Sequence, residues 1–166
     1  MTYESRQIWM IGPPKVGKTC ITWRLIGEGF FEETSPTLQM KVDNFNNFSI
    51  IELGGQFIFS PQWKSLLLKG NPGLIFFVID SENLEEGFAS LKQFIKEVPD
   101  YFLNLSETVL LINKIDKISD SQENIEKLEQ FRKKINITSI FCSAKTRRGF
   151  LDITDIIEEK MNKEKE

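Results

Sequence analysis

The chain has 166 residues, 40% of them hydrophobic, and its 21 basic and 24 acidic residues give a formal net charge of −3. This composition predicts one globular domain over residues 1–166, with residues 160–166 as a frayed helix end, and the lack of a basic excess excludes a typical nucleic-acid binder. Histidine is absent, so any catalysis has to rest on carboxylates, amides, lysines or a metal ion.

Apolar strand-like runs alternate with helical stretches along the chain. Continuous apolar runs such as 74–79 are typical of strands covered on both faces, and Asn46-Asn47 indicates a hairpin turn between two strands. These features predict an α/β fold with about six strands in a mostly parallel sheet, one antiparallel strand and helices on both faces. Strands are expected at 6–12, 38–45, 48–53, 73–79, 108–113 and 138–142, and helices at 18–28, 60–69, 84–97, 121–135 and 148–162.

The segment 12–19 reads Gly-Pro-Pro-Lys-Val-Gly-Lys-Thr and fits the phosphate-binding spacing G-x-x-x-x-G-K-[ST] without a mismatch. A strand-like run before it and a helical pattern after it favour this motif over a surface turn with incidental glycines. Successive N–H groups and the helix N-terminus are expected to face the phosphates, with Lys18 reaching the β- and γ-phosphates and Thr19 ligating Mg²⁺. The residues expected to contact the nucleotide here are Gly12, Lys15, Val16, Gly17, Lys18, Thr19 and Cys20.

Two further segments supply candidates for the γ-phosphate side. Thr37 follows Ser35-Pro36, and its hydroxyl is a candidate Mg²⁺ ligand, the alternative being a plain loop threonine. Glu52 ends a strand and is expected to reach a metal-bound water, while Gly55 allows a backbone N–H to approach the γ-phosphate. Gln56 is placed to orient an attacking water, the alternative being an exposed glutamine in a mobile loop.

A base-recognition site is indicated by Asn113-Lys114-Ile115-Asp116, which follows an apolar strand. The Asp116 carboxylate can accept hydrogen bonds from guanine N1–H and the 2-amino group, whereas adenine presents an acceptor at N1 and is rejected. Lys114 can lie across the base, and Asn113 can tie this loop to the phosphate loop. Downstream, the backbone of Ser143-Ala144-Lys145 can contact the guanine 6-oxo group. Alone, these segments also suit a solvated polar turn and a Ser-capped helix start.

Four of these segments, at 12–19, 54–56, 113–116 and 143–145, follow the carboxyl end of an expected strand, where ligands of open α/β sheets bind. Asp80 also ends an apolar run, a pattern shared with ATPases that use the acid as a metal ligand. We interpret Asp80 as a structural or capping residue, because the guanine-type loop already indicates the class. The two cysteines, Cys20 and Cys142, lie in apolar segments and are expected to be buried thiols rather than a disulfide.

Together these segments resemble a small GTPase of the Ras superfamily over essentially the whole chain. Ser35-Pro36-Thr37, Gly54-Gly55-Gln56 and Pro61-Gln62-Trp63 resemble its Arf/Arl/Sar branch in particular. The resemblance implies a P-loop NTPase G domain with a GTP-bound on state, a GDP-bound off state and two switch segments that reorder on hydrolysis. The chain departs from the family at Ile51-Glu52, where Trp-Asp is usual, and has Thr2 where Arf proteins carry a glycine for myristoylation.

The expected function is Mg²⁺-dependent GTP binding with slow hydrolysis to GDP and phosphate, used as a regulatory switch. The alternative is a GTP-bound scaffold that does not cycle, which Glu52 favours and the intact Gln56 opposes. A weaker alternative, an ATPase or kinase, is opposed by the guanine-type loop at 113–116.

Protein regulators and effectors are the expected partners, because an apolar cluster surrounds the Gln56 segment. Packing of the same residues on the core is the alternative, especially for Trp63. Since neither an amphipathic N-terminal helix nor a prenylation cysteine is present, we expect a monomeric cytoplasmic protein without a lipid anchor. The residues of the expected partner surface are Met40, Phe57, Ile58, Phe59 and Trp63.

Overall fold

The apolar runs of the sequence become the strands of a single sheet. The computed structural model describes residues 6–32, 34–35, 37, 40–55, 61, 65–66, 69–70, 72–98 and 108–162. Within them the sheet has six strands in the order β2-β3-β1-β4-β5-β6. Neighbouring strands are parallel except β2 and β3, which pair antiparallel across the turn at Asn46 and Asn47. The strands are β1 (Arg6–Ile11), β2 (Met40–Phe45), β3 (Phe48–Leu53), β4 (Pro72–Asp80), β5 (Thr108–Asn113) and β6 (Ser139–Phe141).

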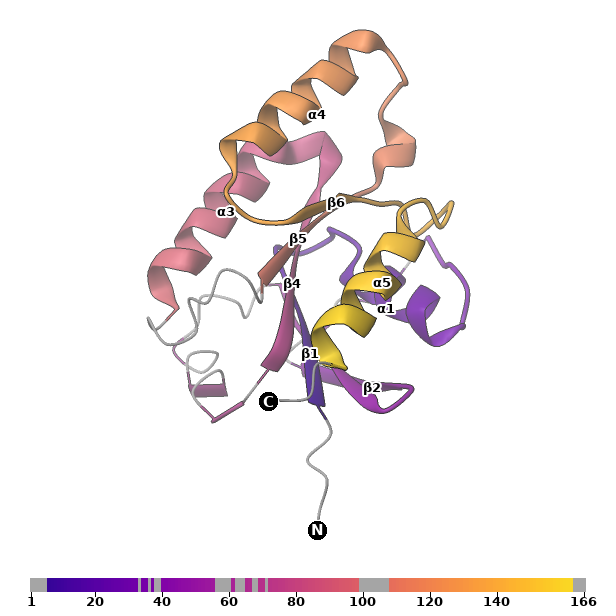
Figure 1. The fold of residues 1–166 in the computed structure, drawn as a ribbon, viewed down its shortest axis with the longest axis vertical. Coiled ribbons are helices and arrows are strands. Elements are labelled where there is room, and N and C mark those ends of the chain that lie inside the picture. Colours follow the sequence, from indigo (N-terminus) through magenta and orange to yellow (C-terminus); the bar gives the residue numbers. More distant parts are fainter. Residues whose placement is uncertain are drawn as a thin grey trace.

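Helices cover both faces of this sheet, as the sequence predicts. Figure 1 shows α3 and α4 on one side of the strands and α1 and α5 on the other. The helix expected at 60–69 lies largely outside the described residues. The helices are α1 (Lys18–Ile26), α3 (Leu84–Glu97), α4 (Gln122–Lys134) and α5 (Phe150–Met161), with 3-10 turns at Ser81–Asn83 and Ile115–Lys117.

Alternation along β1 shows how the core is divided. Ile8 and Met10 pack in the cluster that α1 and α5 cover, whereas Trp9 and Ile11 pack in the cluster beneath α3 and α4. Because β1 is buried on both faces, its four apolar residues read as a continuous run rather than an alternating pattern. This double burial holds the central strands in place, and with them the loops that follow their carboxyl ends.

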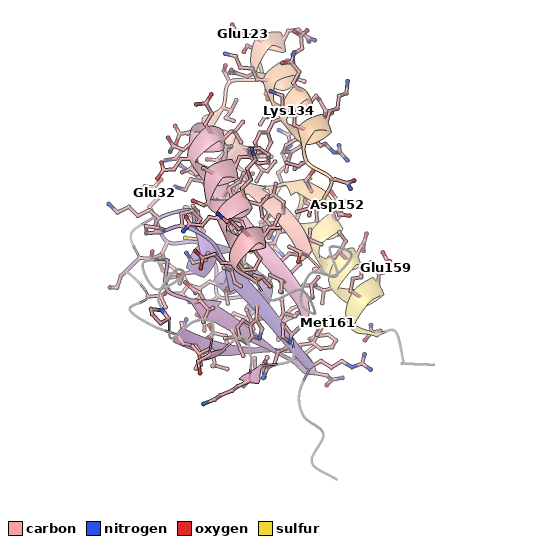
Figure 2. The ribbon with its side chains drawn as sticks, turned by 90° about the vertical axis from the view of Figure 1, so that its left-hand side faces the viewer. Glu32, Glu123, Lys134, Asp152, Glu159 and Met161 are labelled. Carbon is pink, nitrogen blue, oxygen red and sulfur yellow. The ribbon has the colours of Figure 1, made fainter. Side chains whose placement is uncertain are left out.

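The outermost helix, α4, has no fully buried residue and is strongly charged. Its inner side contacts α3 through the rings of Phe88 and Phe131, whose centroids are 5.4 Å apart in an edge-on arrangement. Figure 2 shows Glu123 and Lys134 near the two ends of this helix, with charged side chains projecting outward. α4 therefore forms a solvated outer layer.

α5 ends close to the limit of the helix expected at 148–162. Of residues 160–166, predicted as a frayed tail, the first two belong to α5, and Met161 is only 1% exposed and part of the core, while 163–166 lie outside the described residues. Met161 lies against Gly73 of β4, where a Cβ atom would come within 2.9 Å of the methionine sulfur. Burial of this one apolar side chain holds the last helical turn against the sheet.

Within the described residues, no helix is both long enough and apolar enough to cross a membrane.

Candidate nucleotide-binding site

The phosphate loop between β1 and α1 needs glycine at its two ends. Gly12 has φ +153°, and a Cβ atom there would lie 2.2 Å from the carbonyl oxygen of Val78. Gly17, which precedes the first residue of α1, has φ +95°, and its Cβ would lie 2.4 Å from Nδ2 of Asn113. A side chain at Gly12 would therefore strike the backbone of β4, and one at Gly17 would displace the Asn113 amide. The loop is pressed against two neighbouring strands as the glycine spacing predicts.

Lys18 begins α1 and is 5% exposed. Its ammonium donates hydrogen bonds to the carbonyl oxygens of Gly12 and Pro13 at 3.0 and 2.7 Å, so the lysine folds back over the loop. Burial lowers the pKa of Lys18 to about 8, and the negative charge of Glu52 partly opposes that shift. A lysine desolvated at a helix N-terminus and within a ring of backbone amides is arranged to receive an anion.

Glu52 connects the two threonines expected to ligate a metal. Its Oε1 accepts hydrogen bonds from the hydroxyls of Thr19, at 2.6 Å, and of Thr37, at 2.8 Å. The glutamate is 1% exposed, and its Oε2 is buried with no hydrogen-bond partner among the described residues. A cavity of about 150 Å³ opens between these side chains, Lys18 and Gly55.

These donors fit a hard divalent cation. Hydroxyl and carboxylate oxygens are the ligand type that Mg²⁺ prefers, and the unpartnered Oε2 of Glu52 needs a positive partner. The described residues contain no cluster of three or more His, Cys, Asp or Glu side chains that could hold a metal. A metal here would therefore depend on the hydroxyls of Thr19 and Thr37, one carboxylate and the oxygens of a bound phosphate.

Asn113, at the end of β5, joins three segments that are distant in the sequence. Its Nδ2 donates to the carbonyl oxygen of Val16 in the phosphate loop at 2.9 Å. Its Oδ1 accepts from the backbone N–H of Ala144 at 3.1 Å. The predicted tie between the guanine-type loop and the phosphate loop is thus present, and the same amide also holds the Ser143-Ala144-Lys145 segment.

Asp116 lies on the 3-10 turn after β5 and is exposed at the edge of a second cavity of about 670 Å³. Its Oδ1 accepts a hydrogen bond of 2.6 Å from the hydroxyl of Ser143, which in turn accepts from the N–H of Thr146 at 3.1 Å. These contacts orient the carboxylate toward the cavity that Ala144 also lines. Lys15 and Gly17 line the same cavity, so the guanine-type loop and the phosphate loop share one continuous surface.

A comparison with known protein families agrees with this geometry. The model of the Ras family matches residues 7–163, nearly the whole chain. The chain belongs to the Ras family. Members of this family are small GTP-binding regulatory proteins with GTPase activity. The mostly parallel sheet with one antiparallel strand and surrounding helices is that of a P-loop GTPase domain, as the sequence predicts.

In this Ras-family domain Asp80 has the structural, capping role that we inferred from the sequence. Its Oδ1 accepts from the N–H of Glu82 at 3.0 Å and so caps the turn after β4. Its Oδ2 forms an ion pair of 2.7 Å with Lys114. Lys114 also donates to the carbonyl oxygen of Lys15 at 2.6 Å, so its aliphatic stem runs along the 670 Å³ cavity toward the phosphate loop.

Arg24 is a site residue that sequence reasoning missed. Its guanidinium donates to the carbonyl oxygens of Ala144 and Lys145 at 2.7 and 2.8 Å. These contacts bridge α1 and a loop about 120 positions away, and nothing in the local pattern of α1 distinguishes Arg24 from an ordinary solvated arginine. Lys145 in turn forms a 3.0 Å ion pair with Glu32, which Figure 2 labels at the left edge of the molecule.

The remaining sequence-predicted residues are the two cysteines, Met40, and the segment around Gln56. Cys20 and Cys142 are both buried free thiols, as expected, and burial raises the pKa of each, that of Cys142 to about 12. Met40 is 48% exposed on β2, consistent with a place on the surface. The predicted water-orienting Gln56 lies outside the described residues, as do the other predicted partner-surface residues Phe57, Ile58, Phe59 and Trp63.

Proposed function

We propose that this Ras-family protein binds GTP and GDP together with Mg²⁺, hydrolyses GTP slowly, and acts as a molecular switch related to the Arf/Arl/Sar branch. The observation that carries the proposal is the double hydrogen bonding of Asn113, which places the phosphate loop and both guanine-type segments around one cavity.

Each segment has a distinct part in the proposed binding. The amides of Lys15 to Thr19 and the ammonium of Lys18 hold the phosphates, and Gly55 lets the backbone approach the γ-phosphate. Asp116 accepts hydrogen bonds from the guanine ring, the backbone of the Ser143-Ala144-Lys145 segment lies on the 6-oxo side, and the stem of Lys114 covers one face of the base. We assign Lys145 and Ser143 to the shaping of this same pocket.

Thr19, Thr37 and Glu52 are the side chains that would hold Mg²⁺. When bound, the ion supplies positive charge that neutralises the β- and γ-phosphate oxygens. The hydroxyl contacts of Glu52 support this placement, because they hold both threonines on one side of the 150 Å³ cavity. We assign the orientation of the attacking water to Gln56.

Slow hydrolysis is proposed because no arginine lines the described part of the γ-phosphate cavity. An arginine supplied by a partner typically contributes about 10³–10⁵ in rate. Single-turnover hydrolysis by the purified protein tests the proposal, and Gln56→Leu should slow it further. A chain that retains GTP without any turnover would instead be the non-cycling scaffold, which the departure at Glu52 favours.

Protein regulators and effectors are the proposed partners, contacted around Met40 and the Gln56 segment, by a monomer in the cytoplasm. The exposed side chain of Met40 on the edge strand β2 supports a protein contact there. Co-sedimentation with anionic vesicles in both nucleotide states tests this proposal. GTP-dependent vesicle binding by the isolated chain would contradict it.

A further inference from the structure

The carboxylate of Glu52 is unusual in how it is used. One oxygen, Oε1, accepts from both Thr19 and Thr37, while the other is buried without a hydrogen-bond partner among the described residues. A carboxylate that is 1% exposed and half unsatisfied is costly unless a positive charge compensates it. Burial lowers the pKa of Lys18 and the charge of Glu52 partly opposes that shift, but the ammonium of Lys18 donates its hydrogen bonds to the carbonyl oxygens of Gly12 and Pro13 rather than to Glu52.

The two spacings around Oε1 of Glu52, which are ordinary O–H···O distances, also fit neighbouring ligands on one small cation. Mg²⁺ holds its ligands at about 2.0–2.1 Å in an octahedron, so adjacent ligand oxygens are about 2.9 Å apart. Oε1 of Glu52 lies 2.6 Å from the hydroxyl of Thr19 and 2.8 Å from that of Thr37. Each threonine donates its proton to the carboxylate, which leaves the hydroxyl lone pairs free for a cation.

The side-chain length of Glu52 makes this spacing possible. An aspartate at the end of β3 would place its oxygens about one carbon–carbon bond, roughly 1.5 Å, further back, which leaves more room for a water between the carboxylate and the ion. The longer side chain of glutamate brings its carboxylate to the 150 Å³ cavity itself.

We propose that Glu52 binds the metal ion directly through its carboxylate and replaces one water of the coordination sphere. This inference rests on the proposed Mg²⁺–nucleotide site and specifies how this chain completes it. Glu52 then holds Thr19, Thr37 and the ion together as one unit. The ion should carry one water fewer than it would beside an aspartate.

Electron paramagnetic resonance of Mn²⁺ in the GDP complex counts those waters directly. Water enriched in ¹⁷O broadens the Mn²⁺ lines in proportion to the number of bound waters, so wild type, Glu52→Asp and Glu28→Asp are compared. Glu28 is an exposed residue just after α1 and controls for the loss of a methylene elsewhere. We expect Glu52→Asp to gain one bound water and Glu28→Asp to match wild type.

Equal water counts in wild type and Glu52→Asp would overturn the inference while leaving the proposed function intact. Mn²⁺ binding only after Glu52→Asp would also overturn it, because Glu52 would then exclude the metal. Failure of wild type to bind GDP at all, measured first by calorimetry, would instead remove the proposed function. If Glu52→Asp does not fold, ¹³C electron–nuclear double resonance is measured on the Mn²⁺ complex of wild type labelled at the glutamate carboxyl carbons. A strong coupling between Mn²⁺ and a labelled carbon supports direct binding, and its absence overturns the inference.

Discussion

The two halves of the site differ in how much of their hydrogen bonding the protein itself provides. On the guanine side, Asn113 is bonded to Val16 and Ala144, and Ser143 holds Asp116. On the phosphate side, Lys18 is desolvated with a pKa lowered to about 8 by burial, and Glu52 keeps a buried oxygen without a partner among the described residues.

This difference separates what the fold builds from what a ligand supplies. The guanine side is held by bonds between distant segments, so we expect it to be arranged before a ligand binds. The phosphate side contains buried charges whose cost a nucleotide and a cation offset. We therefore expect base selection to depend on the guanine side, and the response to the phosphates to depend on the phosphate side, which a ligand would complete.

The largest effect on nucleotide binding is expected from Asp116→Asn, which removes the carboxylate proposed to accept hydrogen bonds from guanine. Losing two hydrogen bonds from guanine and leaving polar groups unpaired should weaken GDP binding on the order of a thousandfold. Xanthosine diphosphate, with a carbonyl at C2, should recover affinity. Competition against a fluorescent GDP analogue measures both. Asp120→Asn, at a nearby exposed acid that forms a 4.0 Å pair with Arg148, is the matched control. Unchanged preference for GDP over ADP in Asp116→Asn would contradict the assignment.

A second test separates the two halves by cutting the tie between them. Gly17→Ala and Gly27→Ala both introduce a side chain at positive φ, +95° and +86°, at a cost of about 1–2 kcal/mol each. Only at Gly17 would the new Cβ meet Asn113, at 2.4 Å, whereas nothing lies within 4 Å at Gly27. Displacing the Asn113 amide should cost about 1–3 kcal/mol more, measured by urea unfolding. Equal losses in the two variants would show that the tie contributes nothing.

Much of this site could be predicted from the sequence, because its loops carry local motifs. The spacing of Gly12, Gly17, Lys18 and Thr19 defines a loop conformation by itself, and the apolar runs before each loop place it at one edge of a parallel sheet. The bonds of Arg24 and the double use of Glu52 could not be predicted. Nothing in the pattern of α1 indicates the partners of Arg24, and the expected place of Glu52 beside the metal, with Thr19 and Thr37, does not indicate that one of its oxygens accepts from both hydroxyls.

The smallest effect is expected from Arg24, which supports the guanine side from outside the cavity. Arg24→Gln removes two hydrogen bonds to the carbonyls of Ala144 and Lys145, worth about 1–2 kcal/mol together. GDP dissociation should become up to about tenfold faster, with partial rescue in Arg24→Lys. The guanidinium also lies 5.7 Å from the ring centre of Phe30, which lines the 670 Å³ cavity, so Arg24→Lys, which keeps a cation beside that ring, is the control for the loss of charge. The same GDP dissociation rate in wild type and Arg24→Gln would show that the bonds from Arg24 do not position the 143–145 segment.

Amide hydrogen exchange with and without GDP and Mg²⁺ tests the difference between the two halves most directly. The N–H of Ala144 is already bonded to Asn113, whereas the first N–H groups of α1, at Lys18 and Thr19, lack partners within the helix. We predict strong new protection over residues 15–19 and little change at Ala144 when GDP and Mg²⁺ bind. Protection of equal size in both segments, or larger at Ala144, would contradict it.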